Sequence, residues 1–173
     1  MKIKNSFVKR TCSFYASEYH LVTMLLPHII QNVEENIETK TFLQEKLEEN
    51  VNDLVNVINL ENVKQKLIRN IAWNSKRDLN YNVIRKELDK CKDRILNIIV
   101  SGNYDYVEQI NQHIKKWLMK SNKQLVIEIN NCYMIESKLN YQKVISKHDC
   151  ILNTSGETKI DNIFEFEQGA SNF

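Results

Sequence analysis

Glycine and proline are scarce in this sequence, with three glycines and one proline among 173 residues. Such a composition leaves little room for flexible linkers, and the length is that of one ordinary domain with its own core. We therefore predict a single domain over residues 1–173, with a tail, 165–173, that either docks or frays. A phosphate-binding loop of the form G-x-x-x-x-G-K-[ST] is excluded, because glycine stands only at 102, 156 and 169.

A strong net charge, a long apolar run and paired cysteines are missing as well. The net charge is +2, with acids and bases interspersed, which disfavours binding to DNA or RNA. The most apolar segment, 21–30, is about half the ~20 residues that a membrane-spanning helix needs. We find no apolar export signal after Met1. The four cysteines form no C-x-x-C pair, so we predict reduced thiols and a cytoplasmic location.

Short aliphatic runs alternate with segments of helical periodicity. We predict strands at 11–15, 39–43, 67–73, 95–100, 125–129 and 150–152, with a continuous helix over 34–49 as the alternative for the second. We predict helices at 19–33, 45–58, 59–66, 80–94 and 104–119, with a further helical link between the last two strands. This alternation is typical of an α/β fold with a mostly parallel, doubly wound sheet of about five strands and helices on both faces.

Polar and aromatic residues follow the predicted strands where each one ends. Ligands of open parallel sheets bind in the crevice outside the carboxyl ends of the strands. We therefore predict a small-molecule site, without a resident cofactor, in this crevice. The candidate ligand-binding residues are Tyr15, Trp73, Gly102, Asn103, Cys132, Tyr133 and His148. For each residue alone, turn chemistry or core packing is the alternative explanation.

His20, Met24 and His28 recur at every fourth position of the first predicted helix. Two imidazoles and a thioether would suit copper or haem iron. The two histidines, however, are about 12 Å apart on a straight helix, so one ion cannot bind both. We predict packing for this row and no metal site.

Two cysteine pairings offer catalytic alternatives. Cys132 and His148 belong to the same predicted strand–helix–strand unit, and a neighbouring imidazolium would activate the thiol. Cys132 and Cys150, on strands predicted to be adjacent, would form a redox pair, although buried inert thiols are more common. No third group that would orient His148 can be named, so we predict no catalytic residues and keep a thiol-dependent enzyme as the alternative.

Several segments occur in the order found in the MEDS family, the sensory domains of methanogen and methylotroph regulators. An aromatic strand, Ser13-Phe14-Tyr15, precedes a helix that has a proline late in its length. The segment 101–103 then stands where the family has a Gly-acid turn, and it is followed by a helix with Glu108 and Asn111. Cys132-Tyr133 ends a later strand, and His148 precedes the last one. From about Thr11 to Phe164 the chain therefore resembles this family.

The resemblance implies a RecA- or KaiC-like fold without a working phosphate loop, and a sensory rather than a catalytic role. It also implies that the domain acts through a partner protein, a kinase or a transcription regulator, with a homodimer as a further possibility. Asn103 stands where the family often has an acid, and Asp149 replaces a proline, so no chemistry is assigned to these two positions. A protein-binding scaffold built on a degenerate nucleotide-binding fold is the remaining alternative.

Overall fold

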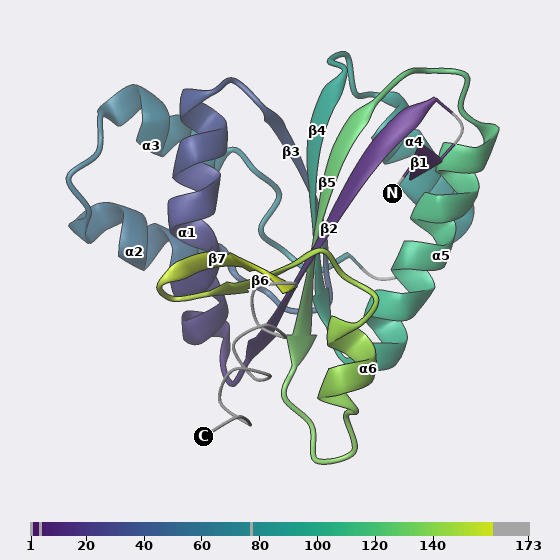
Figure 1. Cartoon of the computed structure of the whole chain (residues 1–173). Helices are drawn as coiled ribbons and strands as arrows, with labels where there is room; N and C mark the ends of the chain where they lie inside the picture. The colour runs from purple at the N-terminus through teal and green to yellow at the C-terminus, as the bar shows by residue number, and fades with distance from the viewer. Residues whose placement is uncertain (1, 4, 77, 161–173) are drawn as a thin grey trace.

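A computed structural model describes residues 2–3, 5–76 and 78–160 of the chain (Figure 1). The predicted tail, 165–173, lies outside the described residues. Within the described ranges, strands and helices alternate along most of the chain. The predicted α/β class is therefore confirmed.

One sheet runs through the middle of the molecule. Its strands are β1 (Lys2–Ile3), β2 (Ser6–Tyr15), β3 (Glu38–Leu43), β4 (Ile95–Gly102), β5 (Val126–Met134), β6 (Cys150–Asn153) and β7 (Gly156–Lys159). Six of them lie in the order β3-β4-β5-β2-β6-β7, and β1 pairs with β2. The five strands from β3 to β6 are parallel, whereas β1 and β7 pair antiparallel. These two short strands raise the number of strands above the predicted five.

Helices cover both faces of the sheet (Figure 1). They are α1 (Glu18–Glu34), α2 (Glu48–Val57), α3 (Asn62–Arg69), α4 (Tyr81–Asp89), α5 (Tyr104–Lys120) and α6 (Tyr141–Ile145). In the figure α1, α2 and α3 lie on one side, and α4, α5 and α6 lie on the other. Each side has its own buried core, with Leu21 and Leu25 among the residues of the first and Ile110 and Ile114 among those of the second.

Side-chain caps fix where several helices begin. The cap residues each accept a hydrogen bond from a backbone N–H in the first turn; they are Ser17, Asn80, Asn103 and Asn140. Pro27 lies inside α1, and the helix nevertheless continues to Glu34. Only two residues, Ala16 and Ser17, separate the end of β2 from the start of α1.

The predicted strand at 67–73 is wrong. Residues 62–69 form α3, and only Ile68 of this helix is fully buried. The chain then turns, and the Trp73 indole N–H donates to the Ile68 carbonyl oxygen at 2.7 Å. A short apolar run does not by itself distinguish a strand from a buried helix turn, which explains the error. The strand predicted at 39–43 is confirmed as β3.

No helix in the part of the chain that the structure describes is both long enough and apolar enough to cross a membrane.

Candidate functional site

The carboxyl ends of the parallel strands meet at one edge of the sheet, as predicted. Tyr15 is in register with Met134, and Gly102 is in register with Tyr133. Asn103 follows directly as the cap of α5. The edge therefore brings together five of the seven candidate residues, since Cys132 precedes Tyr133 on β5.

These side chains are engaged with neighbours. Tyr15 and Tyr133 are 2% and 0% exposed. The Tyr15 hydroxyl donates to Glu45, and the Tyr133 hydroxyl donates to Glu108 Oε1 at 3.0 Å. Residues that we expected to line a crevice are thus part of the packed interior.

Trp73 and His148, the other two candidates, are also buried. Trp73 belongs to the core between the sheet and α1 to α3, because the segment before it is a helix. His148 lies against the edge of the Tyr133 ring, with the ring centroids 5.9 Å apart. Its Nδ1 lies 2.7 Å from the Val144 carbonyl oxygen, and its Nε2 lies 3.0 Å from Asn131 Nδ2.

The structure does not bring Cys132 and His148 together as a thiolate pair. Successive strand residues point to opposite faces of a sheet. Cys132 belongs to the core beneath α1, whereas Tyr133, which contacts His148, belongs to the other core. Burial raises the pKa of the Cys132 thiol to about 12 and lowers the pKa of His148 to about 4. At neutral pH both groups are therefore uncharged.

The predicted pairing of Cys132 with Cys150 is wrong as well. The strand β2 lies between β5 and β6, so the two cysteines are not on adjacent strands. All four cysteines are free and buried.

At the start of α1, backbone N–H groups that could bind a ligand are already bonded to side chains of the same segment. The turn between β2 and α1 contains only Ala16 and Ser17. The Ala16 N–H donates to His20 Nδ1, and the His20 N–H donates to Ser17 Oγ. The acid Glu18 then occupies the first turn, where a negative side chain repels an anionic ligand. This turn holds no cradle for a phosphate group.

The start of α5 is occupied in the same way. The Asn103 N–H donates to Gln44 Oε1 at 2.8 Å, and Asn103 Oδ1 accepts from the Tyr106 N–H at 2.9 Å. Asp105 lies in the first turn. An anion at this end would compete with all three groups.

Glu45 is a half-buried acid at the strand ends that sequence reasoning missed. Its Oε2 accepts from Ser101 Oγ at 2.7 Å, and its Oε1 accepts from the Tyr15 hydroxyl. Burial raises the pKa of this carboxyl group. Glu45 therefore closes the edge by joining β2 to β4.

The face of the sheet beneath α1 is unusually polar. Register places its side chains in rows across β2, β5 and β4: Lys9, Glu128 and Asn97; then Thr11, Asn130 and Ile99; then Ser13, Cys132 and Ser101. On the opposite face the corresponding residues include Val8, Ile127 and Leu96. A parallel strand covered by helices is usually apolar on both faces, so the polar rows are a feature that packing alone does not require.

A cavity of about 470 Å³, here called the α1 pocket, lies between α1, this polar face and the β6–β7 hairpin. Lys9 and Glu128 line it from the sheet, His28 and Asn32 from α1, and Glu157 from β7. Figure 1 shows the hairpin on the same side of the sheet as α1. Four separate parts of the sequence thus form the walls of this pocket.

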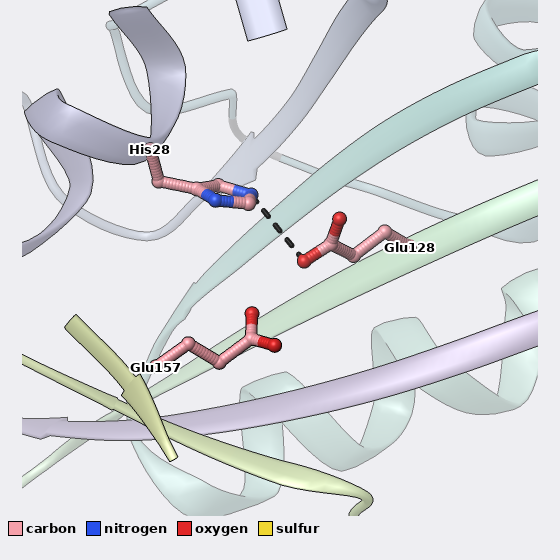
Figure 2. A group of neighbouring side chains, drawn as sticks. All are labelled: His28, Glu128 and Glu157. Atoms are coloured by element: carbon pink, nitrogen blue, oxygen red, sulfur yellow. Dashed lines mark ion pairs between the residues drawn. The ribbon is translucent and has the colours of Figure 1, made fainter. Parts of the chain in front are cut away.

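Three side chains converge in the α1 pocket. Figure 2 shows His28, Glu128 and Glu157 pointing toward one another from the helix, the central strand and the hairpin. His28 Nε2 lies 3.4 Å from Glu128 Oε1. Lys9 Nζ lies 2.5 Å from Glu157 Oε1 and 3.7 Å from Glu128 Oε1. Imidazole, carboxylate and ammonium groups therefore share one small space.

The Lys9 ammonium group and the Glu157 carboxylate stabilise each other's charge. Burial opposes the charge of Lys9, but the hydrogen bond to Glu157 and the two nearby carboxylates outweigh it and raise the pKa of the ammonium group. Burial likewise opposes the charge of Glu157, and Lys9 outweighs it and lowers the pKa of the carboxyl group. The lysine and the glutamate are therefore both charged at neutral pH.

The sequence contained a signal for this pocket that we did not use. Glu128 interrupts the apolar run 125–129, and Lys9 precedes Thr11 and Ser13 at alternate positions of β2. Charged residues at inward positions of a buried strand indicate a polar interior. We predicted packing for the row of His20, Met24 and His28: Met24 is buried, whereas His28 lines the α1 pocket and the His20 ring accepts from the Ala16 N–H.

No known protein-family model and no curated protein sequence matches this chain.

Proposed function

We propose that the chain is a non-catalytic sensory or regulatory module that binds a small polar ligand in the α1 pocket and acts through a partner protein. One observation carries the proposal: the pocket has a polar lining that the protein does not fully satisfy. Asn32 lines the pocket and is only 4% exposed, yet its Nδ2 has no hydrogen-bond partner among the described residues. Buried amide groups are nearly always paired, so a bound polar molecule would complete this one.

The state of the reactive groups supports a role without catalysis. The Cys132 thiol is fully buried and His148 is bonded to Asn131 and Val144 on the other face. A cysteine nucleophile requires an accessible thiolate with a nearby base. These two residues meet neither condition, which disfavours the thiol-dependent enzyme.

The course of the chain through the sheet supports a RecA-like, doubly wound arrangement. The first parallel strand, β2, lies between β5 and β6, the last two parallel strands along the chain. The strands β3, β4 and β5 thus lie on one side of β2 and β6 lies on the other, so that the chain crosses over β2 between β5 and β6. Together with the resemblance to the MEDS family, this favours a sensory domain in the cytoplasm whose partner is a kinase or a transcription regulator.

A thermal-shift screen against metabolites tests the ligand. A ligand at 100 times its Kd adds about 2.7 kcal/mol of stability, which is readily measured as a rise in Tm. The rise should disappear in Asn32→Leu, which fills the polar lining with an apolar side chain. It should persist in Asn52→Leu, a matched change on α2 that does not line the pocket. A rise that survives Asn32→Leu, or a screen without any rise, would contradict binding in this pocket.

An exposed apolar row favours a second candidate, the protein-binding scaffold. Phe7, Val126 and Ile95 are in register at the amino ends of β2, β5 and β4. Their exposed fractions are 56%, 48% and 48%. Neighbouring exposed apolar side chains of this size indicate a contact surface, and a second copy of the chain is one occupant that can be tested directly.

Sedimentation of the purified chain over a range of concentrations tests this second candidate. Self-association should weaken in Phe7→Ser and stay unchanged in Val63→Ser, which alters an even more exposed apolar residue on α3. A monomer at every concentration would exclude the homodimer.

A further inference from the structure

The His28, Glu128 and Glu157 side chains provide three metal-binding atoms from three different elements. One nitrogen and two carboxylate oxygens, one from each residue, lie within 4.8 Å of one another. Figure 2 shows the three side chains facing one another. Imidazole and carboxylate ligands together are typical of zinc and related divalent ions.

The distances suit a tetrahedral ion. Zinc binds imidazole nitrogen and carboxylate oxygen at about 2.0–2.2 Å, so two ligand atoms in tetrahedral geometry lie roughly 3.4 Å apart. His28 Nε2 and Glu128 Oε1 already have this separation. Glu157 belongs to a strand whose residues are all exposed, so its side chain can complete the set by rotation once it releases the Lys9 ammonium group.

Lys9 at present supplies the positive charge that the two carboxylates need. Its ammonium group contacts Glu157 Oε1 at 2.5 Å and stands 3.7 Å from Glu128 Oε1. The Lys9 side chain is 34% exposed. A long lysine side chain of this kind can move its charged end into water while its stem stays in place.

Two further observations indicate a missing group in the same pocket. Glu128 Oε1 is buried and accepts no hydrogen bond among the described residues, and its ion-pair partners His28 and Lys9 stand 3.4 Å and 3.7 Å away, beyond close contact. The Asn32 amide is buried in the lining of the pocket, and its Nδ2 also has no partner in the described part of the chain. A metal ion with a bound water would satisfy both, the carboxylate by coordination and the amide by a hydrogen bond.

We propose that the α1 pocket binds a divalent cation, with Zn²⁺ as the best match, through His28, Glu128 and Glu157, and that the ion displaces the Lys9 ammonium group. This inference rests on the proposed function in one respect, because it names the ligand class of the same pocket. The exchange keeps a positive charge beside the two carboxylates, because the metal ion takes the place of the Lys9 ammonium group. Lys9 then competes with the metal ion for the two carboxylates and lowers the affinity of the pocket for the metal.

Competition by Lys9 predicts an unusual order of affinities. Lys9→Met removes the competing charge and keeps most of the apolar stem, so Zn²⁺ should bind at least about tenfold more tightly than in the wild type. His28→Ala should lose binding, because two carboxylates without the imidazole are a poor zinc site. His113→Ala changes a histidine of α5 that lies outside the cluster, and should bind Zn²⁺ as the wild type does.

Calorimetric titration of the chelator-treated full chain with Zn²⁺ measures these affinities. Co²⁺ provides a second readout, because visible absorption of bound Co²⁺ reports an N/O coordination sphere, and circular dichroism checks that each variant is folded. The proposal expects one Zn²⁺ per chain, tighter binding in Lys9→Met and loss in His28→Ala. It would be overturned by a folded wild type and Lys9→Met that bind no Zn²⁺, or by binding that His28→Ala leaves unchanged. Equal affinities of Lys9→Met and the wild type would overturn the displacement of Lys9.

The metabolite screen separates this inference from the proposed function. A metabolite that raises the Tm through Asn32, with no zinc binding, overturns the metal site and leaves the proposed function in place. Loss of both signals overturns both.

Discussion

Gly102 holds the end of β4 in a conformation that suits few other residues. Its φ is +153°, and an added Cβ atom would lie 2.5 Å from Gln44 Oε1 and 2.8 Å from Tyr106 Cδ1. We expect Gly102→Ala to lower the free energy of unfolding by more than about 2 kcal/mol, through backbone strain and the displacement of these side chains. Urea denaturation measures the loss.

Gly156 supplies the control for this prediction. Its φ is +116°, and an added Cβ would meet nothing within 4 Å. Gly156→Ala should therefore cost only the backbone strain, about 1 kcal/mol. Equal losses for the two glycines would show that the contacts of Gly102 are unimportant.

His148 makes the stability depend on pH. Burial lowers its pKa to about 4, and the Arg10 guanidinium group adds to this effect, whereas an unfolded histidine has a pKa of about 6.5. The unfolded chain therefore binds the proton more readily. The stability that His148 contributes is complete above about pH 6.5 and is lost as the pH falls toward 4, by about 3 kcal/mol in total.

A comparison with His148→Gln isolates this contribution, because glutamine does not titrate. We expect the difference in free energy of unfolding between the wild type and the variant to shrink steadily from pH 7 to pH 4.5. Urea denaturation at each pH gives the two values. A difference that stays constant over this range would contradict a neutral, buried His148.

Among the elements, the central strands show how strongly one position differs from the next. Ile127 on β5 is fully buried, whereas Ile95 on β4 is 48% exposed. Ile127→Ala should lower the free energy of unfolding by about 2–5 kcal/mol, since it leaves a cavity in the core. The identical change at Ile95 should cost well under half as much. Denaturation of the two variants measures both losses, and similar values would place the two residues in similar environments.

The elements were predictable from the sequence where apolar periodicity was long or sharply bounded. The strand around Ile98, the helix around Ile114 and the strand around Ile127 were found, because their apolar residues face one continuous core. The segment before Trp73 was misread, since one apolar run fits a strand and a buried helix turn equally well. Only tertiary contacts decide between them: the Leu47 N–H donates to the Trp73 carbonyl oxygen, and Ile68 and Trp73 belong to the same buried core as Leu47.

The candidate site was less predictable than the fold. The edge where Tyr15 and Tyr133 meet followed from the parallel topology, but whether it is open depends on Glu45 and other side chains that fill it. The α1 pocket joins Lys9 to Glu157, which are 148 positions apart in the chain. No local pattern contains such a contact, so the pocket becomes visible only when the strand order is known.

On the scale of the whole molecule, stability should be distributed unevenly over the sheet. The residues of β7 are all exposed, and within the described part of the chain they pair only with β6, whereas those of β4 are buried from its second residue onward. Local opening needs little energy where few apolar groups are buried. In native hydrogen exchange, we expect the amides of β6 and β7 to exchange first and those of β2, β4 and β5 last.

Mass spectrometry of peptides covering 126–134 and 150–159 can measure this contrast. Equal protection of the two segments would show that the hairpin opens only when the whole sheet does.

The place of β2 between β5 and β6 also sets an order of events during synthesis. β2 is made early, but both of its parallel neighbours come from the last third of the described chain, and the Ser6 hydroxyl bonds to a carbonyl 117 residues later. At translation rates of about 5–20 residues per second, that partner emerges roughly 6–23 s afterwards. Until then β1 can pair with only the first two residues of β2. The nascent chain thus carries β2 without its parallel neighbours for many seconds. During this time the strand needs a chaperone, because its unpaired edges can start aggregation.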